Sequence, residues 1–167
     1  MMALPISFAR SSGFLGSLLV VLALLAPSSG WSQTYVGRVC LVSTLTERQT
    51  GPVSPQQFAI ELAVTNLGGN TYAVAGALVS PSDGPFVVTG SGTIVGNDLY
   101  LNMTTSQAHS LAHGWMDTGI MQARLSLENN LSGTFYEIGH DFDRVGRSFD
   151  NSRYSAGTAT LSLAGCN

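Results

Sequence analysis

The sequence contains no lysine, and charged side chains of either sign are few. Seven arginines carry the positive charge, charged residues make up 10% of the 167-residue chain, and the formal net charge is −3. No stretch of the chain concentrates arginine. A nucleic-acid-binding surface needs clustered cations to neutralise phosphates, so the composition argues against a nucleic acid partner.

Cysteine is equally scarce, with Cys40 and Cys166 as the two representatives. Neither belongs to a CxxC motif, and two thiols alone do not supply the four ligands of a structural zinc site. The sequence also lacks a phosphate-cradling glycine loop and a recognisable nucleophile motif. We therefore predict no cofactor, no metal and no assigned catalytic residue. In an exported protein the two cysteines are expected to form a disulfide.

One long hydrophobic run is present, at residues 14–26 (FLGSLLVVLALLA), after the single charge of Arg10 and before Pro27 and several small residues. This order is typical of a secretory signal peptide. The run is shorter than the roughly 20 residues of a spanning helix, which favours a cleaved signal over an uncleaved membrane anchor. We interpret residues 1–32 as the signal peptide and residues 33–167 as one secreted domain without a membrane span, extracellular or, in a bacterium, periplasmic.

Alternation of apolar and polar residues predicts eight strands in the mature chain. It is clearest where Phe58, Ile60, Leu62 and Val64 alternate with other residues, because a half-buried strand has a period of two. Glycine- and asparagine-rich turns separate the runs, as at residues 96–98. The eight predicted runs are residues 36–46, 57–65, 71–80, 86–95, 99–104, 119–127, 131–140 and 155–163.

Strands that follow one another without helical crossovers favour an antiparallel meander, and eight strands can close into a barrel. The connections after the second, fourth and sixth runs are tight, whereas those after the first, third, fifth and seventh are longer. In an up-and-down barrel these two sets lie at opposite ends. We predict an all-β, eight-stranded antiparallel up-and-down β-barrel, with a β-sandwich as the alternative. Cys40 and Cys166 would meet at the tight-turn end and join the first strand to the last.

This architecture resembles the calycin barrels, namely the lipocalins and avidins, and more loosely the dirigent-type barrels. The resemblance lies in strand number and order. Tyr35-Val36-Gly37-Arg38 stands where a lipocalin would show Gly-x-Trp, and Gly90-Ser91-Gly92-Thr93 only faintly resembles the glycine-rich strand of dirigent proteins. The resemblance implies the fold, and no family residue is transferred to this sequence.

The long connections carry the polar side chains from which a site at that open end could be built. Two histidines four residues apart, as in residues 106–118, can bind one metal on a helical turn, although the spacing assigns no third ligand and two solvated histidines are the simpler interpretation. Residues 141–153 offer arginines that suit anions or a protein partner, but exposed Arg–Asp pairs explain them equally simply. The candidate ligand-binding residues are His109, His113, Trp115, Glu137, His140, Arg144 and Arg147.

Glu137 has two possible orientations. It shares strand parity with Leu131 and Phe135, which would direct it into the barrel, whereas Tyr136 and Ile138 define an equally apolar opposite face. An inward carboxylate would be partly desolvated and would need a partner.

Three functions are compatible with such a barrel. The first is binding of a small apolar or amphiphilic ligand at the open end. Strand glycines 76, 90, 92 and 133 could leave room for that ligand, or could instead let the barrel curve around a packed core. The second is a non-enzymatic interaction protein, such as an inhibitor or envelope component, that uses the long loops against a protein partner. The third is an enzyme with His109, His113 or Glu137 at the barrel mouth. Composition and spacing leave the oligomeric state open.

Overall fold

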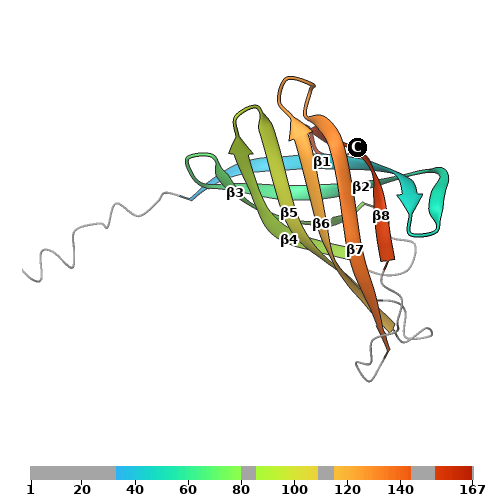
Figure 1. Cartoon of the computed structure of the whole chain (residues 1–167). Coiled ribbons are helices and arrows are strands. Elements are labelled where there is room, and N and C mark those ends of the chain that lie inside the picture. The colour runs from blue at the N-terminus through green and yellow to red at the C-terminus, as the bar shows by residue number, and fades with distance from the viewer. Residues whose placement is uncertain (1–32, 80–85, 109–114, 144–152, 167) are drawn as a thin grey trace, which may run out of the picture. The chain divides into compact units, whose positions relative to one another are not determined.

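The computed structural model describes residues 33–79, 86–108, 115–143 and 153–166, and residues 33–167 form one compact unit. Eight strands form a closed barrel in chain order, and every neighbouring pair, including β1 with β8, is antiparallel (Figure 1). The strands are β1 (Thr34–Arg48), β2 (Gly51–Gly68), β3 (Thr71–Leu78), β4 (Phe86–Val95), β5 (Asp98–Ala108), β6 (Trp115–Ser126), β7 (Ser132–Asp143) and β8 (Arg153–Ser162). The predicted up-and-down barrel is confirmed, and the sandwich alternative is wrong.

The first connection differs from its prediction. Residues 47–56 were expected to form a long connection, but β1 and β2 continue as a paired hairpin until Arg48 pairs with Gly51. Among the described residues, positions 51–58 of β2 pair with β1 alone, so this segment is a sheet edge. An edge tolerates Pro52 and Pro55 because no second ladder requires their missing N–H groups. The prolines indicated a loop in a segment that is an edge strand.

The other connections follow the predicted alternation. The turns after β2, β4 and β6 span residues 69–70, 96–97 and 127–131 and lie at one end of the barrel. The turns after β4 and β6 are together at the top of Figure 1 and are joined by the Leu127 N–H, which donates to the Asn97 carbonyl at 2.9 Å. The longer connections after β3, β5 and β7 leave from the opposite end. We call these ends the tight-turn end and the long-connection end.

Inward-facing glycines let the sheet curve tightly enough to close. A Cβ atom at Gly133 would overlap the carbonyl oxygen of Arg124 on the neighbouring strand. Gly76, Gly90 and Gly157 approach the backbone of an adjacent strand in the same way. Glycine at such positions permits the close backbone approach and the bending that closure requires. Of the two roles predicted for the strand glycines, these therefore serve curvature.

The middle of the barrel is filled by side chains. Met103 and Met121 are directly paired on β5 and β6 and are 1% and 0% exposed. The Phe58 ring meets the Phe135 ring edge-on, with centroids 5.6 Å apart. We call the following set of bulky, fully buried residues the plug: Ile60, Val88, Met103, Met121 and Phe135.

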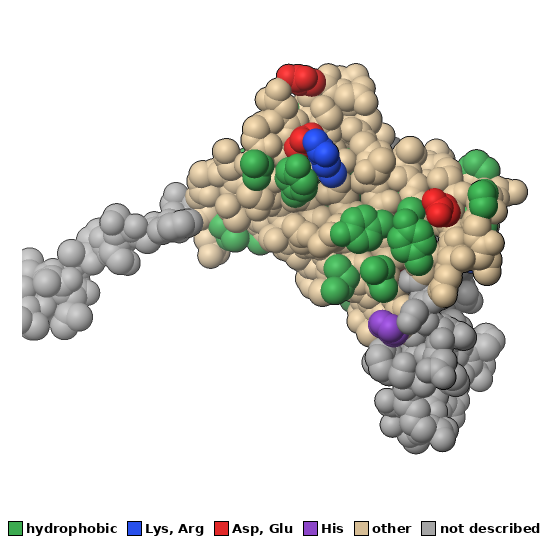
Figure 2. All heavy atoms as spheres, in the orientation of Figure 1, with side chains coloured by type: hydrophobic (Ala, Val, Ile, Leu, Met, Phe, Trp, Pro, Cys, Tyr) green, Lys and Arg blue, Asp and Glu red, His purple; other side chains and the backbone are tan. Residues whose placement is uncertain are grey.

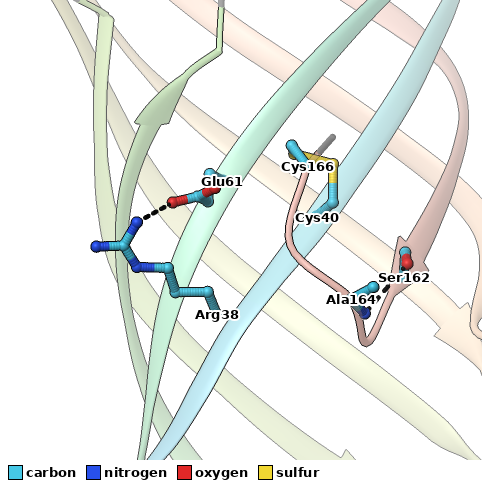
Figure 3. Close-up of a disulfide and its surroundings, with 6 residues drawn as sticks. All are labelled: Arg38, Cys40, Glu61, Ser162, Ala164 and Cys166. Atoms are coloured by element: carbon cyan, nitrogen blue, oxygen red, sulfur yellow. Dashed lines mark hydrogen bonds and ion pairs between the residues drawn. A yellow bond between two sulfur atoms is a disulfide. The ribbon is translucent and has the colours of Figure 1, made fainter.

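Cys40 and Cys166 form the predicted disulfide, with their Cα atoms 4.8 Å apart. Cys40 lies on β1 opposite Ser162, the last residue of β8, and its neighbours Val39 and Leu41 belong to the core. The chain after β8 turns back so that Cys166 reaches the outer side of β1 (Figure 3). The bond therefore closes the seam between the first and last strands, as predicted.

Candidate functional site: an apolar cavity at the tight-turn end

An apolar cavity of about 250 Å³ lies at the tight-turn end of the barrel. Six strands, β1 to β5 and β8, contribute residues to it, and the turn between β6 and β7 contributes Leu127 and Leu131. Its lining residues are Val36, Val39, Leu62, Val64, Tyr72, Val74, Gly92, Ile94, Leu99, Leu101, Leu127, Leu131, Leu161 and Leu163. None of the plug residues is among them. Met103 follows the lining residue Leu101 on β5, and Phe135 on β7 follows Leu131 of the preceding turn, so the plug forms the inner limit of the cavity.

The cavity runs from a buried floor to an exposed mouth. Leu62 and Leu101, next to the plug, are 0% and 3% exposed, whereas Val36 and Leu163 are 58% and 75% exposed. A cavity of about 150 Å³ lined by aliphatic and aromatic side chains is known to hold benzene. The larger volume here suits an apolar group of more than one ring or a short hydrocarbon chain.

The lining contains one polar side-chain group, the hydroxyl of Tyr72. Gly92 is the one glycine, and a Cβ atom there would lie 3.1 Å from Leu101 Cδ2 and 3.4 Å from Leu99 Cδ1. The nearest atoms thus belong to side chains. At the glycines that permit curvature (Gly76, Gly90, Gly133 and Gly157) the nearest atoms are instead backbone atoms of an adjacent strand. Among the four strand glycines considered from the sequence, Gly92 is the one that leaves room inside.

Leu131 adopts an unusual backbone conformation at the cavity wall, with φ of 54° after Asn130 with φ of 48°. Asparagine tolerates this left-handed region, but for leucine it is uncommon and costs about 1–3 kcal/mol. The Leu131 N–H donates to the Ser126 carbonyl, and its own carbonyl accepts from Leu161 N–H, both at 2.9 Å. These bonds hold Leu131 where its side chain lines the cavity.

The long-connection end of the interior is polar. Glu137 points to the inner side of β7, because the adjacent Tyr136 and Ile138 are 43% and 47% exposed on the outside. Thr105, which is 3% exposed, donates through Oγ1 to Glu137 Oε1 at 2.9 Å, and Asp117 is buried on the neighbouring strand. Of the two orientations considered for Glu137, the inward one is therefore observed, with a hydrogen-bond donor beside it.

Of the other predicted site residues, the structure describes His140 and the backbone of Trp115. His140 lies on β7, which continues beyond the predicted end to Asp143, and its exposed side chain has the parity opposite to that of Glu137. Trp115 is the first residue of β6, where it pairs with Asp143. His109, His113, Arg144 and Arg147 lie outside the described residues. The apolar cavity was missed because its lining residues read as ordinary core positions, and the glycine at position 92 was the one sequence signal for it.

The outer surface has two further features. A trough of about 440 Å³ on β1–β3 has an alanine floor and an Arg38–Glu61 ion pair of 2.7 Å at its side. None of its lining residues is buried, so it is less enclosed than the apolar cavity. The negative charge of Glu61 raises the pKa of Arg38, with their hydrogen bond as the second cause. Figure 2 shows the other feature, a group of apolar side chains over β6–β8, whose members are Ile120, Tyr136, Ile138 and Tyr154.

Comparison with known proteins gives no match to this chain among family models, curated proteins or solved structures. The barrel is compatible with a calycin-like fold on architecture alone. Within the described ranges, the structure has no helix with the length and apolarity that a membrane crossing requires. In the same ranges, no three His, Cys, Asp or Glu side chains come together as metal ligands would.

Proposed function

We propose that this protein binds a small apolar ligand in the cavity at the tight-turn end. The observation that carries the proposal is a cavity of about 250 Å³ whose lining is hydrocarbon except for Tyr72. Ligand pockets are usually preformed, concave and mostly apolar. The cavity lies at the opposite end from the one that the loop lengths indicated, since the long connections leave from the far side of the plug. A calycin-like role would agree with this proposal.

The disulfide supports the further proposal that the protein works outside the cytoplasm. Stable disulfides persist in oxidising compartments such as the extracellular space and the bacterial periplasm. Cys40 and Cys166 are bonded, and the described residues contain no free cysteine. This agrees with the interpretation of residues 1–32 as a signal peptide.

A binding titration tests the ligand proposal. The neutral fluorophore N-phenyl-1-naphthylamine should show saturable enhancement with the wild-type protein, because its emission rises in an apolar environment. Val74→Phe should abolish this signal, since Val74 is 5% exposed and lines the cavity, and a phenyl ring would occupy the space. Val95→Phe is the matched control: Val95 is 61% exposed and is not a lining residue. Equal titrations for both variants would refute the proposed site.

A second candidate function, binding of a protein partner, has one observation in its favour. Ile120 pairs with Ile138, and Ile138 pairs with Tyr154, so three exposed apolar side chains are adjacent across β6–β8, with Tyr136 beside them. Contiguous exposed apolar groups of this kind mark interaction surfaces. Capture of the same partner by wild-type protein and by an Ile120→Asp, Ile138→Asp variant would argue against this surface, and its loss in the variant would support it.

A further inference from the structure

One wall of the cavity mouth differs from the others in how it is held. β8 ends at Ser162, and its last pair with β1 is Ser162 with Cys40, whereas β1 continues to Thr34. Leu163 follows directly and lines the cavity, although 75% of its surface is exposed. The mouth is therefore completed on this side by a segment that has left the sheet.

The other walls are fixed by backbone hydrogen bonds between neighbouring strands and turns. Ile94 N–H donates to the Asn70 carbonyl, and Leu127 N–H donates to the Asn97 carbonyl, each at 2.9 Å. The Asn97 side-chain amide also donates to Glu128. These bonds connect the three tight turns to one another or to an adjacent strand, and such a ladder resists local opening.

Few interactions besides the disulfide hold the segment that carries Leu163 in place. In the described part of the chain its one hydrogen bond is from Ala164 N–H to Ser162 Oγ, at 3.3 Å (Figure 3). Cys166, two residues further on, is bonded to Cys40. We propose that Leu163 is a movable wall of the cavity, held in place by the Cys40–Cys166 disulfide, so that affinity for an apolar ligand depends on the oxidation state of this pair. This inference rests on the proposed function.

The chemistry of opening is a thiol–disulfide exchange. A small dithiol attacks one sulfur, the Cys40–Cys166 bond breaks through a mixed disulfide, and the dithiol closes into its own disulfide. Two electrons and two protons pass from the dithiol to the protein, which then carries two thiols. Leu163 is left attached to β8 alone, and the ligand loses part of its apolar contact.

The test compares N-phenyl-1-naphthylamine affinity in oxidised protein and in protein reduced with dithiothreitol, with far-UV circular dichroism to identify folded samples. Reduction should raise Kd about three- to tenfold, the loss expected for a partly enclosed leucine contact. Leu163→Ala should raise Kd by a similar factor in oxidised protein, and reduction of this variant should add nothing, because the two changes remove the same contact. Val95→Ala, an exposed valine that does not line the cavity, should behave as wild type in both states.

A further variant keeps the inference testable if the reduced protein unfolds. Two glycines inserted between Ala164 and Gly165 retain the disulfide but slacken the segment, and Kd should rise as it does for Leu163→Ala. Unchanged Kd in this variant, or equal affinity of folded oxidised and reduced wild type, overturns the inference. If the fluorophore binds, and Val74→Phe blocks it while the Leu163 segment has no effect, the ligand proposal stands and this inference alone fails. Absence of saturable binding in oxidised wild type would instead remove the ligand proposal itself.

Discussion

Two glycine-to-alanine substitutions should differ clearly in their effect on stability, although both positions face the barrel interior. At Gly133 a Cβ atom would overlap the Arg124 carbonyl oxygen, so β6 and β7 must separate locally. Overpacking costs about 1–3 kcal/mol, and a weakened ladder hydrogen bond adds about 1 kcal/mol. We therefore expect Gly133→Ala to lower the free energy of unfolding by about 2–4 kcal/mol.

At Gly92 the same methyl group meets side-chain atoms and no backbone: Leu101 Cδ2 at 3.1 Å, Leu99 Cδ1 at 3.4 Å and Tyr72 Cβ at 3.8 Å. Both leucines border the cavity and can shift into it. Alanine also reduces the entropy of the unfolded chain, which stabilises by about 0.4–1 kcal/mol. The expected net change for Gly92→Ala is therefore within about 1 kcal/mol of zero.

Urea unfolding of both variants, with the disulfide intact, measures the difference from the midpoints and slopes. Gly69→Ala is a useful control, because Gly69 has a φ of 58° and no atom within 4 Å of its Cβ position, so its cost reports backbone conformation without steric overlap. Similar destabilisation at positions 92 and 133 would refute the distinction between a cavity glycine and a curvature glycine.

Three other substitutions test the fold. Replacement of both cysteines by serine should lower the free energy of unfolding by about 4 kcal/mol, because the disulfide joins residues that are 126 positions apart and so restricts the unfolded chain. An unchanged urea midpoint would contradict this. Ser43→Ala should leave the free energy of unfolding unchanged or raise it by up to about 1 kcal/mol, because Ser43 is 0% exposed and its Oγ has no hydrogen-bond partner among the described residues. A clear fall in melting temperature would contradict this. Thr105→Val should cost about 1–2 kcal/mol in chemical denaturation, because it removes the 2.9 Å bond to Glu137, and a neutral result would show that this bond contributes nothing.

The barrel could be predicted from the sequence because three independent patterns agree. Strand number, loop lengths and the positions of Cys40 and Cys166 all favour a barrel in which the first and last strands meet, although the first connection is a tight turn and not the predicted long one. Strand length was underestimated, since strand register and edge exposure decide it as much as composition does. Prolines at positions 52 and 55 stand in a strand because that strand has an edge there, and β7 runs beyond its predicted end at residue 140 because it pairs with β6 as far as Asp143.

The site was harder to predict, for a physical reason. The side chains that point into a barrel form layers stacked along its axis, and each layer contains residues from several strands. A cavity forms where the side chains of one layer are too small to fill it, so it depends on which residues share that layer. Leu62 and Leu101 look like Ile60 and Met103 in a periodic pattern, yet the first two line the cavity and the last two belong to the plug. Single-strand patterns do not contain this information, because each layer combines residues from strands that are distant in the sequence.

The plug also determines which ligands the cavity can accept. Along β5 and β7 the plug residues Met103 and Phe135 lie between the cavity end of each strand and the Thr105–Glu137 pair, and none of the residues that line the cavity is charged. A carboxylate at the mouth must keep its full hydration because no lining residue offers a counter-charge, whereas partial desolvation of a hydroxyl costs much less. We therefore expect 1-octanol to displace N-phenyl-1-naphthylamine at least about tenfold more effectively than octanoate at neutral pH. Equal displacement by the two compounds would mean that the ligand binds where a counter-charge is present, on the other side of the plug or on the outer surface.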